Sequence, residues 1–167
     1  MDETPRQLIR EPRAPIPACP GRAERHDYEY ERCGVCNVFM ASEPLAGTRM
    51  TKVTGYKTKV DWAQFLQNIA ERYQDAQKIT LVMDNLNTHF RSSFEEVLGV
   101  ELAERMLARV EFHYTPKHAS WLNMAEIEFA ALSTQCLDRR IPDLPSLRRE
   151  VLAWAAQRNN DQTTVEW

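Results

Sequence analysis

One segment of the sequence places a carboxylate directly after a strand-like run. Residues 79–83 read Ile-Thr-Leu-Val-Met, and the chain continues with Asp84, Asn85 and, four residues later, His89. A β-rich run of this kind predicts a buried strand, so we expect Asp84 at its carboxyl end. Open α/β sheets build their sites along that edge.

A second segment places another acid at the start of a helix. Residues 110–114 predict a strand that Thr115 and Pro116 end, and Asn123 suits the N-cap of a helix whose third residue is Glu126. The two carboxylates could therefore converge. Mg²⁺ prefers such hard oxygen ligands, and two Mg²⁺ ions can stabilise both the attacking and the leaving oxygen in phosphodiester cleavage.

These segments resemble the motifs of a known family, the DDE transposases of bacterial insertion sequences related to mariner. Asp84-Asn85 with His89 is similar to the family's second acidic motif, and residues 122–126 (Leu-Asn-Met-Ala-Glu) are similar to its third. The first acidic motif would then be Asp2, followed by Glu3. The resemblance covers nearly all 167 residues.

The resemblance implies a transposase catalytic domain that cleaves DNA and transfers strands during transposition. Asp2, Asp84 and Glu126 would be its catalytic residues and would hold two Mg²⁺ or Mn²⁺ ions. The DNA, both transposon ends and target, would be contacted by residues near the site and on a basic loop: Lys117, His118, His89, Asn123, Arg13 and Arg22. The implied fold is α/β, a ribonuclease H-like mixed sheet with helices on both faces.

Simpler interpretations of the same residues stay open. Asn123 with Glu126 is also an ordinary capping box, and Asp84 could begin an Asx-turn after its strand. His89, Lys117 and His118 could be solvated loop residues.

Helical periodicity does not choose between Glu126 and Glu128 as the third acid. The apolar residues of this helix recur at helical spacing and define a stripe that both glutamates flank at roughly 80°. They point about 200° apart, so both cannot serve one metal pair. The resemblance selects Glu126, and its place in the first turn favours an ionised carboxylate because of the helix dipole.

Composition sets broad limits on the protein. A chain of 167 residues with 43% hydrophobic residues is in the range of one globular domain. The net charge of −3 gives no general attraction for nucleic acid. Without a run suited to a membrane span or a signal peptide, we expect a cytoplasmic protein, associated with the bacterial nucleoid if it is a transposase.

Cys33 and Cys36 have the spacing of half a zinc site, but no second close pair completes it. We therefore expect reduced structural thiols, as in a cytosolic protein.

Residues 5–27 are rich in proline and arginine, and they include Arg13 and Arg22. We expect neither helix nor sheet there but an extended basic excursion. The resemblance implies that this excursion reaches a second subunit and its DNA, in a homodimer or in a dimer with full-length transposase. A mobile surface loop is the alternative.

The remaining elements should follow in the order hairpin, helix, strand, helix in two pieces broken at Gly99, strand, and two helices. We expect residues 1–167 to form a single partial catalytic domain. Compared with the family, it should lack the N-terminal helix-turn-helix region and most of the first strand, and it should be cut short at its C-terminus.

This expected truncation leaves other functions open. One alternative is an inactive remnant, or a dominant-negative partner that inhibits an intact transposase. Another is a standalone ribonuclease H-like nuclease that acts on branched or hybrid nucleic acid.

Overall fold

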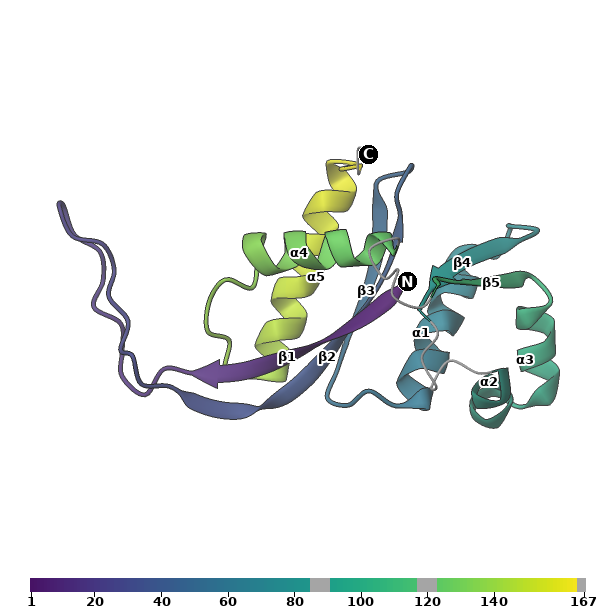
Figure 1. Ribbon diagram of the computed structural model, residues 1–167, viewed down its shortest axis with the longest axis horizontal. Coiled ribbons are helices and arrows are strands. Elements are labelled where there is room, and N and C mark those ends of the chain that lie inside the picture. Colours follow the sequence, from purple (N-terminus) through teal and green to yellow (C-terminus); the bar gives the residue numbers. More distant parts are fainter. Residues whose placement is uncertain (85–90, 117–122, 165–167) are drawn as a thin grey trace.

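A computed structural model describes residues 1–84, 91–116 and 123–164, and it shows a mixed α/β protein (Figure 1). The described strands are β1 (Asp2–Arg10), β2 (Glu31–Glu43), β3 (Thr48–Thr54), β4 (Ile79–Met83) and β5 (Val110–Tyr114). The described helices are α1 (Lys59–Arg72), α2 (Arg91–Leu98), α3 (Val100–Leu107), α4 (Met124–Gln135) and α5 (Leu144–Asn160). No helix in these ranges combines the length and apolarity needed to cross a membrane.

The strands form two sheets that meet at Met1. In the first sheet β2 lies between β1 and β3 and is antiparallel to both, while β4 and β5 form a parallel pair. The Met1 ammonium group donates a hydrogen bond of 2.7 Å to the carbonyl oxygen of Val82 in β4. The beginning of β1 therefore lies between β2 and β4, and the strands follow one another as β3-β2-β1-β4-β5.

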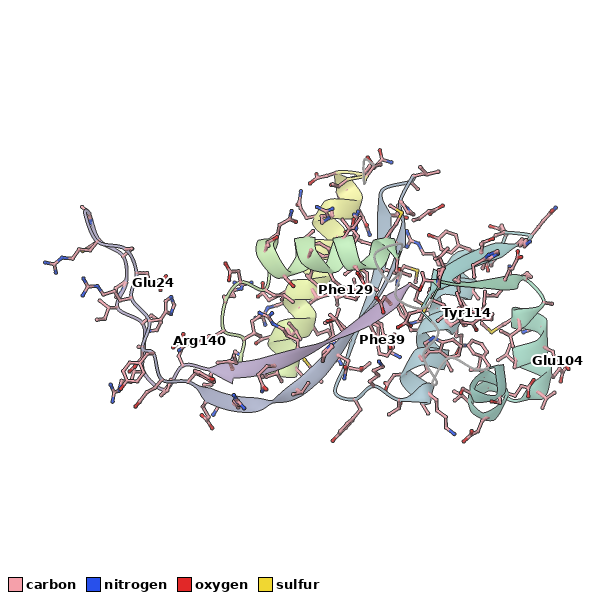
Figure 2. The ribbon with its side chains drawn as sticks, viewed as in Figure 1. Glu24, Phe39, Glu104, Tyr114, Phe129 and Arg140 are labelled. Atoms are coloured by element: carbon pink, nitrogen blue, oxygen red, sulfur yellow. The ribbon has the colours of Figure 1, made fainter. Side chains whose placement is uncertain are left out.

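Helices cover both faces of the first sheet. Successive β2 side chains point to opposite sides, and apolar side chains on each side pack against helices. Val38 and Met40 belong to a core that they share with α4 and α5. Phe39 belongs to a second core, shared with α1 and the β4–β5 pair. Figure 2 shows Phe129 on α4 and Phe39 on β2. We call these two sides the α4 face and the α1 face.

Several elements begin or end where the sequence predicts. Gly99 separates α2 from α3. Its φ of +80° is a backbone conformation that residues with a side chain rarely adopt. Asn123 is the N-cap of α4, and its Oδ1 accepts a hydrogen bond from the Ala125 N–H. The capping box between Thr58 and Asp61, at which α1 begins, was not predicted from the sequence. The predicted strands at 79–83 and 110–114 are confirmed.

The expectation of no regular structure in residues 5–27 is wrong for its first part. Residues 5–10 continue β1, which runs for nine residues and pairs with β2 along its length. Pro5 is tolerated because β1 lies at the edge of the described three-stranded sheet, where a missing N–H need not break a ladder. The expectation that the first strand is largely missing is therefore also wrong for the described chain.

Residues 11–30 form an arm that extends away from the body (Figure 1). Two isolated bridges hold its sides together, Ile16 with Arg25 and Cys19 with Arg22. At its tip Gly21 has φ of +80°, as a turn of type II requires.

Arg140 anchors the root of this arm, near which Figure 2 labels it. Its guanidinium donates to Glu11 Oε2 at 2.6 Å and to the carbonyl oxygens of Glu29 and Asp27, each at 2.9 Å. It also lies over the Tyr30 ring, 5.6 Å from the centroid. Both sides of the arm are thus tied to the segment between α4 and α5.

Candidate active site

The two adjacent acids at the start of β1 face opposite sides of the sheet. Asp2 pairs with Met40 and therefore points to the α4 face. Glu3 pairs with Phe39 and points to the α1 face, where its buried carboxylate forms an ion pair of 2.6 Å with Lys57. Of the two, only Asp2 is directed to the side on which α4 begins.

Asp84 is half-buried at the carboxyl end of β4, as the sequence predicts. Leu81 and Met83 belong to the α1-face core, so continued alternation places Asp84 on the α4 face with Asp2. The pKa of Asp2 is raised to about 6, first by burial and then by the negative charges of Asp84 and Glu3, against a hydrogen bond from the Glu3 N–H. The structure thus brings Asp2 and Asp84 into one electrostatic environment.

Met1 connects this pair of acids to the start of α4. Its ammonium group binds Val82, two residues before Asp84, and its carbonyl oxygen accepts a hydrogen bond of 3.4 Å from Asn123 Nδ2. Burial lowers the pKa of this ammonium group to about 6, although the negative charges of Asp2, Asp84 and Glu3 oppose the shift. Asn123, the N-cap of α4, therefore connects the start of this helix to Met1, the residue before Asp2.

The structure separates the two glutamates that periodicity leaves equivalent. Glu128 is only 1% exposed, whereas Glu126 is exposed and its side chain makes no hydrogen bond or ion pair with another described residue. The Glu128 carboxylate is bound by Arg49 of β3, at 3.0 Å and 3.1 Å, and by Arg158 of α5 at 3.2 Å. The Glu128 carboxylate is thus bound in the interior, and of the two glutamates only Glu126 has an exposed side chain.

We call Arg49, Glu128 and Arg158 the arginine clamp, a cluster that the sequence did not predict. Arg49 also donates to the Thr163 carbonyl oxygen at 2.7 Å, and its backbone exchanges hydrogen bonds with the side chain of Asn159. The clamp joins β3, α4 and α5, and it fixes the rotation of α4 about its axis. The only signal in the sequence is an acid beside the apolar stripe of α4, and that signal cannot name its partners.

The donor set suits a hard divalent cation, because Mg²⁺ prefers carboxylate oxygens, and a metal ion would stabilise the ionised form of Asp2, whose pKa is raised. Asp2 and Asp84 could supply such ligands, and Glu126 could add one from the next element. Among residues 1–84, 91–116 and 123–164, however, no three His, Cys, Asp or Glu side chains are grouped closely enough to hold one metal ion.

The structure places the predicted DNA contacts in different environments. Arg22 is exposed at the tip of the arm, and Arg13 pairs with Asp27 at 3.0 Å. Asn123 is buried, and its side chain is used in the cap of α4 and in the contact with Met1. His89, Lys117 and His118 lie outside the described residues.

We expect Asp2→Asn to raise the free energy of unfolding in EDTA more at pH 7 than at pH 4. The folded-state pKa of about 6 lies above the ordinary value of 3.8, so folding favours the protonated acid. Stability should therefore fall as the pH rises between these values, and the variant should escape that loss. Urea unfolding at pH 4, 5, 6 and 7 measures the difference.

The exposed Asp75→Asn is the matched control, which should show no such dependence on pH. Mg²⁺ should stabilise the wild type at pH 7 and leave Asp2→Asn nearly unchanged. An equal gain from Asp2→Asn at every pH would contradict the electrostatic interpretation of the site.

Comparison with known proteins gives one family. The model of the DDE superfamily endonuclease family matches residues 1–148, a range that includes Asp2, Asp84 and Glu126. No curated protein and no solved structure matches the chain. Since the family model spans most of the 167 residues, the chain belongs to the DDE superfamily endonucleases.

Proposed function

We propose that this protein is the catalytic domain of a transposase that cleaves DNA phosphodiester bonds and transfers strands, and that it is related to the mariner-like insertion-sequence enzymes. The observation that carries the proposal is the shared placement of Asp2 and Asp84 on the α4 face, beside the first turn of α4. The sheet order and the helices on both faces support a ribonuclease H-like fold.

Asp2, Asp84 and Glu126 would hold the metal ions through carboxylate oxygens. Two bound Mg²⁺ or Mn²⁺ ions would supply charge stabilisation for the attacking and leaving oxygens. Glu126 stands in the first turn of α4. The arginine clamp holds Glu128 in the interior, on the same helix as Glu126.

Cleavage assays with three substrates test this function. We expect Mn²⁺ or Mg²⁺ to support nicking or strand transfer on plain duplex DNA that carries a transposon end, and EDTA to abolish it. RNA–DNA hybrid and branched duplexes are the comparison substrates. Activity on these two alone would favour a standalone nuclease instead, and a wild type inert on all three with either metal would overturn the proposal for this chain.

The arm at residues 11–30 is the second part of the proposal. We place DNA phosphate contacts on Arg13 and Arg22, because the arm extends away from the body of the molecule. The hydrogen bonds of Arg140 to Glu11, Asp27 and Glu29 fix the orientation of the arm where it leaves the body. An arm of this length can reach DNA or a second subunit beyond the body of the molecule. A dimer would bring two arms to two DNA ends.

We expect Arg22→Ala to weaken DNA binding equally for different sequences, because phosphate contacts carry no base information. Each lost phosphate contact should reduce the slope of log K against log salt by about 0.9. Fluorescence anisotropy with a labelled duplex at several salt concentrations measures both quantities. Arg149→Ala on α5, also exposed, is the control; a similar loss from both variants would argue against a specific role of the arm.

A further inference from the structure

The root of the arm borders a hollow that contains none of the proposed catalytic acids. It has a volume of about 450 Å³ and lies between β1, the arm and the segment that joins α4 to α5. Apart from Leu137, its lining combines three arginines, a histidine and two acids: Arg6, Arg139, Arg140, His26, Glu11 and Asp138. Figure 2 labels Arg140 at this place. We call this hollow the arm-root pocket.

Two of these arginines have hydrogen-bond donors left over. The Arg6 guanidinium donates to the Leu137 carbonyl oxygen, and Arg139 Nε donates to the Cys136 carbonyl oxygen at 3.2 Å. Arg139 also pairs with Glu150, and the two side chains of this ion pair are 54% and 29% exposed. A guanidinium carries five N–H donors in a planar fork that suits phosphate oxygens. Both arginines therefore retain donors for an anion.

The charges around the pocket also favour an anion. Arg140 compensates the Glu11 carboxylate at 2.6 Å, and the remaining acid of the lining, Asp138, stands against two arginines. Three arginines and two acids give the lining a net charge of +1 with a neutral histidine. Glu150 lies outside the lining and also has Arg149 at 3.5 Å. Each phosphate of a DNA backbone carries one negative charge and would balance this excess.

The arm-root pocket lies on the same face of the sheet as Asp2. Arg6 pairs with Cys36, which belongs to the core on the α4 face, so Arg6 and Asp2 point to the same side. They stand four residues apart in β1, which corresponds to about 13 Å. The segment after α4 bonds to Arg6, and the N-cap of α4 bonds to the residue before Asp2. A phosphate in the pocket would thus lie on the side of the proposed site but outside it.

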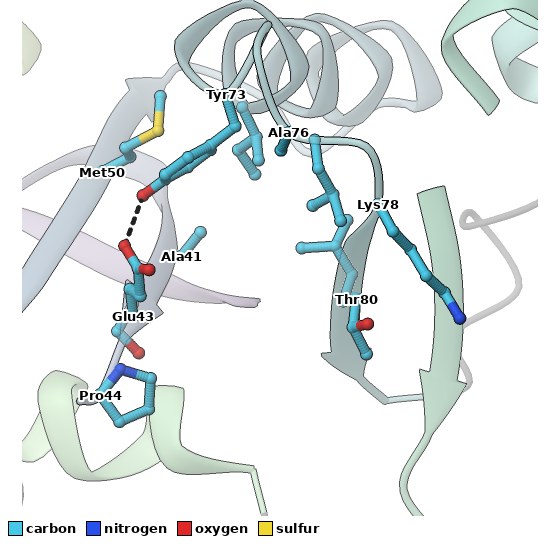
Figure 3. Close-up of a pocket in the computed structure, with 12 residues that line it drawn as sticks. Ala41, Glu43, Pro44, Met50, Tyr73, Ala76, Lys78 and Thr80 are labelled. Carbon is cyan, nitrogen blue, oxygen red and sulfur yellow. Dashed lines mark hydrogen bonds between the residues drawn. The ribbon is translucent and has the colours of Figure 1, made fainter. Parts of the chain in front are cut away.

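The hollow beside the end of α1 has a different lining (Figure 3). Its volume is about 310 Å³, and Ala41, Met50 and Tyr73 are among the residues around it. The Tyr73 hydroxyl donates a hydrogen bond of 3.0 Å to the Glu43 carboxylate there. The described residues that line this hollow include no arginine. An anion would therefore find more N–H donors in the arm-root pocket.

We propose that the arm-root pocket binds a backbone phosphate of DNA, held by Arg6 and Arg139, about 13 Å from the proposed metal site. The assignment of this phosphate to DNA rests on the proposed function. The arm leaves the body at the pocket, so a duplex held between the arm and the body would pass over it (Figure 1). Such a contact would fix the position of the duplex relative to Asp2 without reading its sequence.

Fluorescence anisotropy in EDTA tests the proposal on the full chain, with a labelled DNA duplex as the probe. Arg139→Gln should raise the Kd by about fivefold to tenfold, because charge-assisted hydrogen bonds to a phosphate are lost. Arg6→Gln should have a similar effect, and the double variant should lose less than the product of the two losses, because both side chains hold one phosphate. Arg105→Gln on the exposed side of α3 is the matched control and should bind like the wild type.

NMR of the arginine Nε–H groups in the wild type keeps the test decisive if Arg6→Gln fails to fold. The duplex should shift the Arg6 and Arg139 signals and leave the Arg105 signal unchanged. An unchanged Kd in Arg139→Gln, or an equal rise in Arg105→Gln, would overturn the proposal. So would inorganic phosphate at the same ionic strength if it shifts both signals while the duplex does not, because the pocket would then serve free phosphate. A wild type that binds in the expected way but does not cleave DNA would overturn the proposed function alone.

Discussion

Asp84→Asn should abolish metal-dependent DNA cleavage, with a rate at least roughly 10³-fold below that of the wild type, because a metal centre supplies several kcal/mol of charge stabilisation. The amide keeps the shape of the side chain and removes the charge that a divalent cation requires. Because the charge of Asp84 raises the pKa of Asp2, the variant should bring the pKa of Asp2 closer to its ordinary value. Initial rates with Mn²⁺ measure the loss, and thermal unfolding of the same samples checks that the variant folds.

Two further variants give this prediction its controls. Glu126→Gln should cause a similar loss, whereas Glu104→Gln on the exposed side of α3 should keep full activity. Mn²⁺ titration by calorimetry should show reduced heat for Asp84→Asn and Glu126→Gln and the heat of the wild type for Glu104→Gln. Full cleavage activity in Asp84→Asn would show that the Asp84 carboxylate is not needed for catalysis.

Arg49→Met should lower the free energy of unfolding by about 3–5 kcal/mol, the usual cost of removing one partner from a buried ion pair. The Arg49 and Glu128 side chains are each 1% exposed, so the Glu128 carboxylate would keep only Arg158 as a charged partner in the interior. Urea unfolding measures the loss. The double variant Arg49→Met, Glu128→Leu should be more stable than Arg49→Met, because no buried charge is then left without its main partner.

The ion pair between Arg139 and Glu150 offers a matched control on the surface. Its side chains are 54% and 29% exposed, and Arg139→Met should cost at most about 1 kcal/mol. If both arginine variants lose the same small amount, the clamp does not hold α4 as we describe. A specific consequence for the site is weaker Mn²⁺ binding by Glu128→Gln even under conditions where the variant is fully folded.

The sequence predicted those elements whose own residues determine them. Residues 79–83 and 110–114 are short β-rich runs bounded by polar residues, and Gly99 can adopt the positive φ that separates two helices. Strand β1 was missed because Thr4, Pro5 and Arg6 lack an apolar pattern. Its conformation comes from pairing with β2, a partner more than twenty residues away along the chain, which local propensity cannot reveal.

The same distinction applies to the candidate site. Asp84 could be identified because a strand and its end are local features, and Asn123 could be identified as a cap. The choice between Glu126 and Glu128 could not be made from periodicity, since it depends on Arg49 in β3 and Arg158 in α5. The opposite orientations of Asp2 and Glu3 follow from the register with β2 and required the structure.

The ion pair between Glu3 and Lys57 favours the observed register of β1 against β2. Slippage of β1 by one residue would turn Glu3 toward α4 and Asp2 toward α1, where Lys57 would meet a shorter acid. Correct alignment therefore neutralises one carboxylate in the interior and delivers the other to the opposite side. The pairing of β1 with β2 thus directs two neighbouring acids to opposite faces of the sheet without any bound ligand.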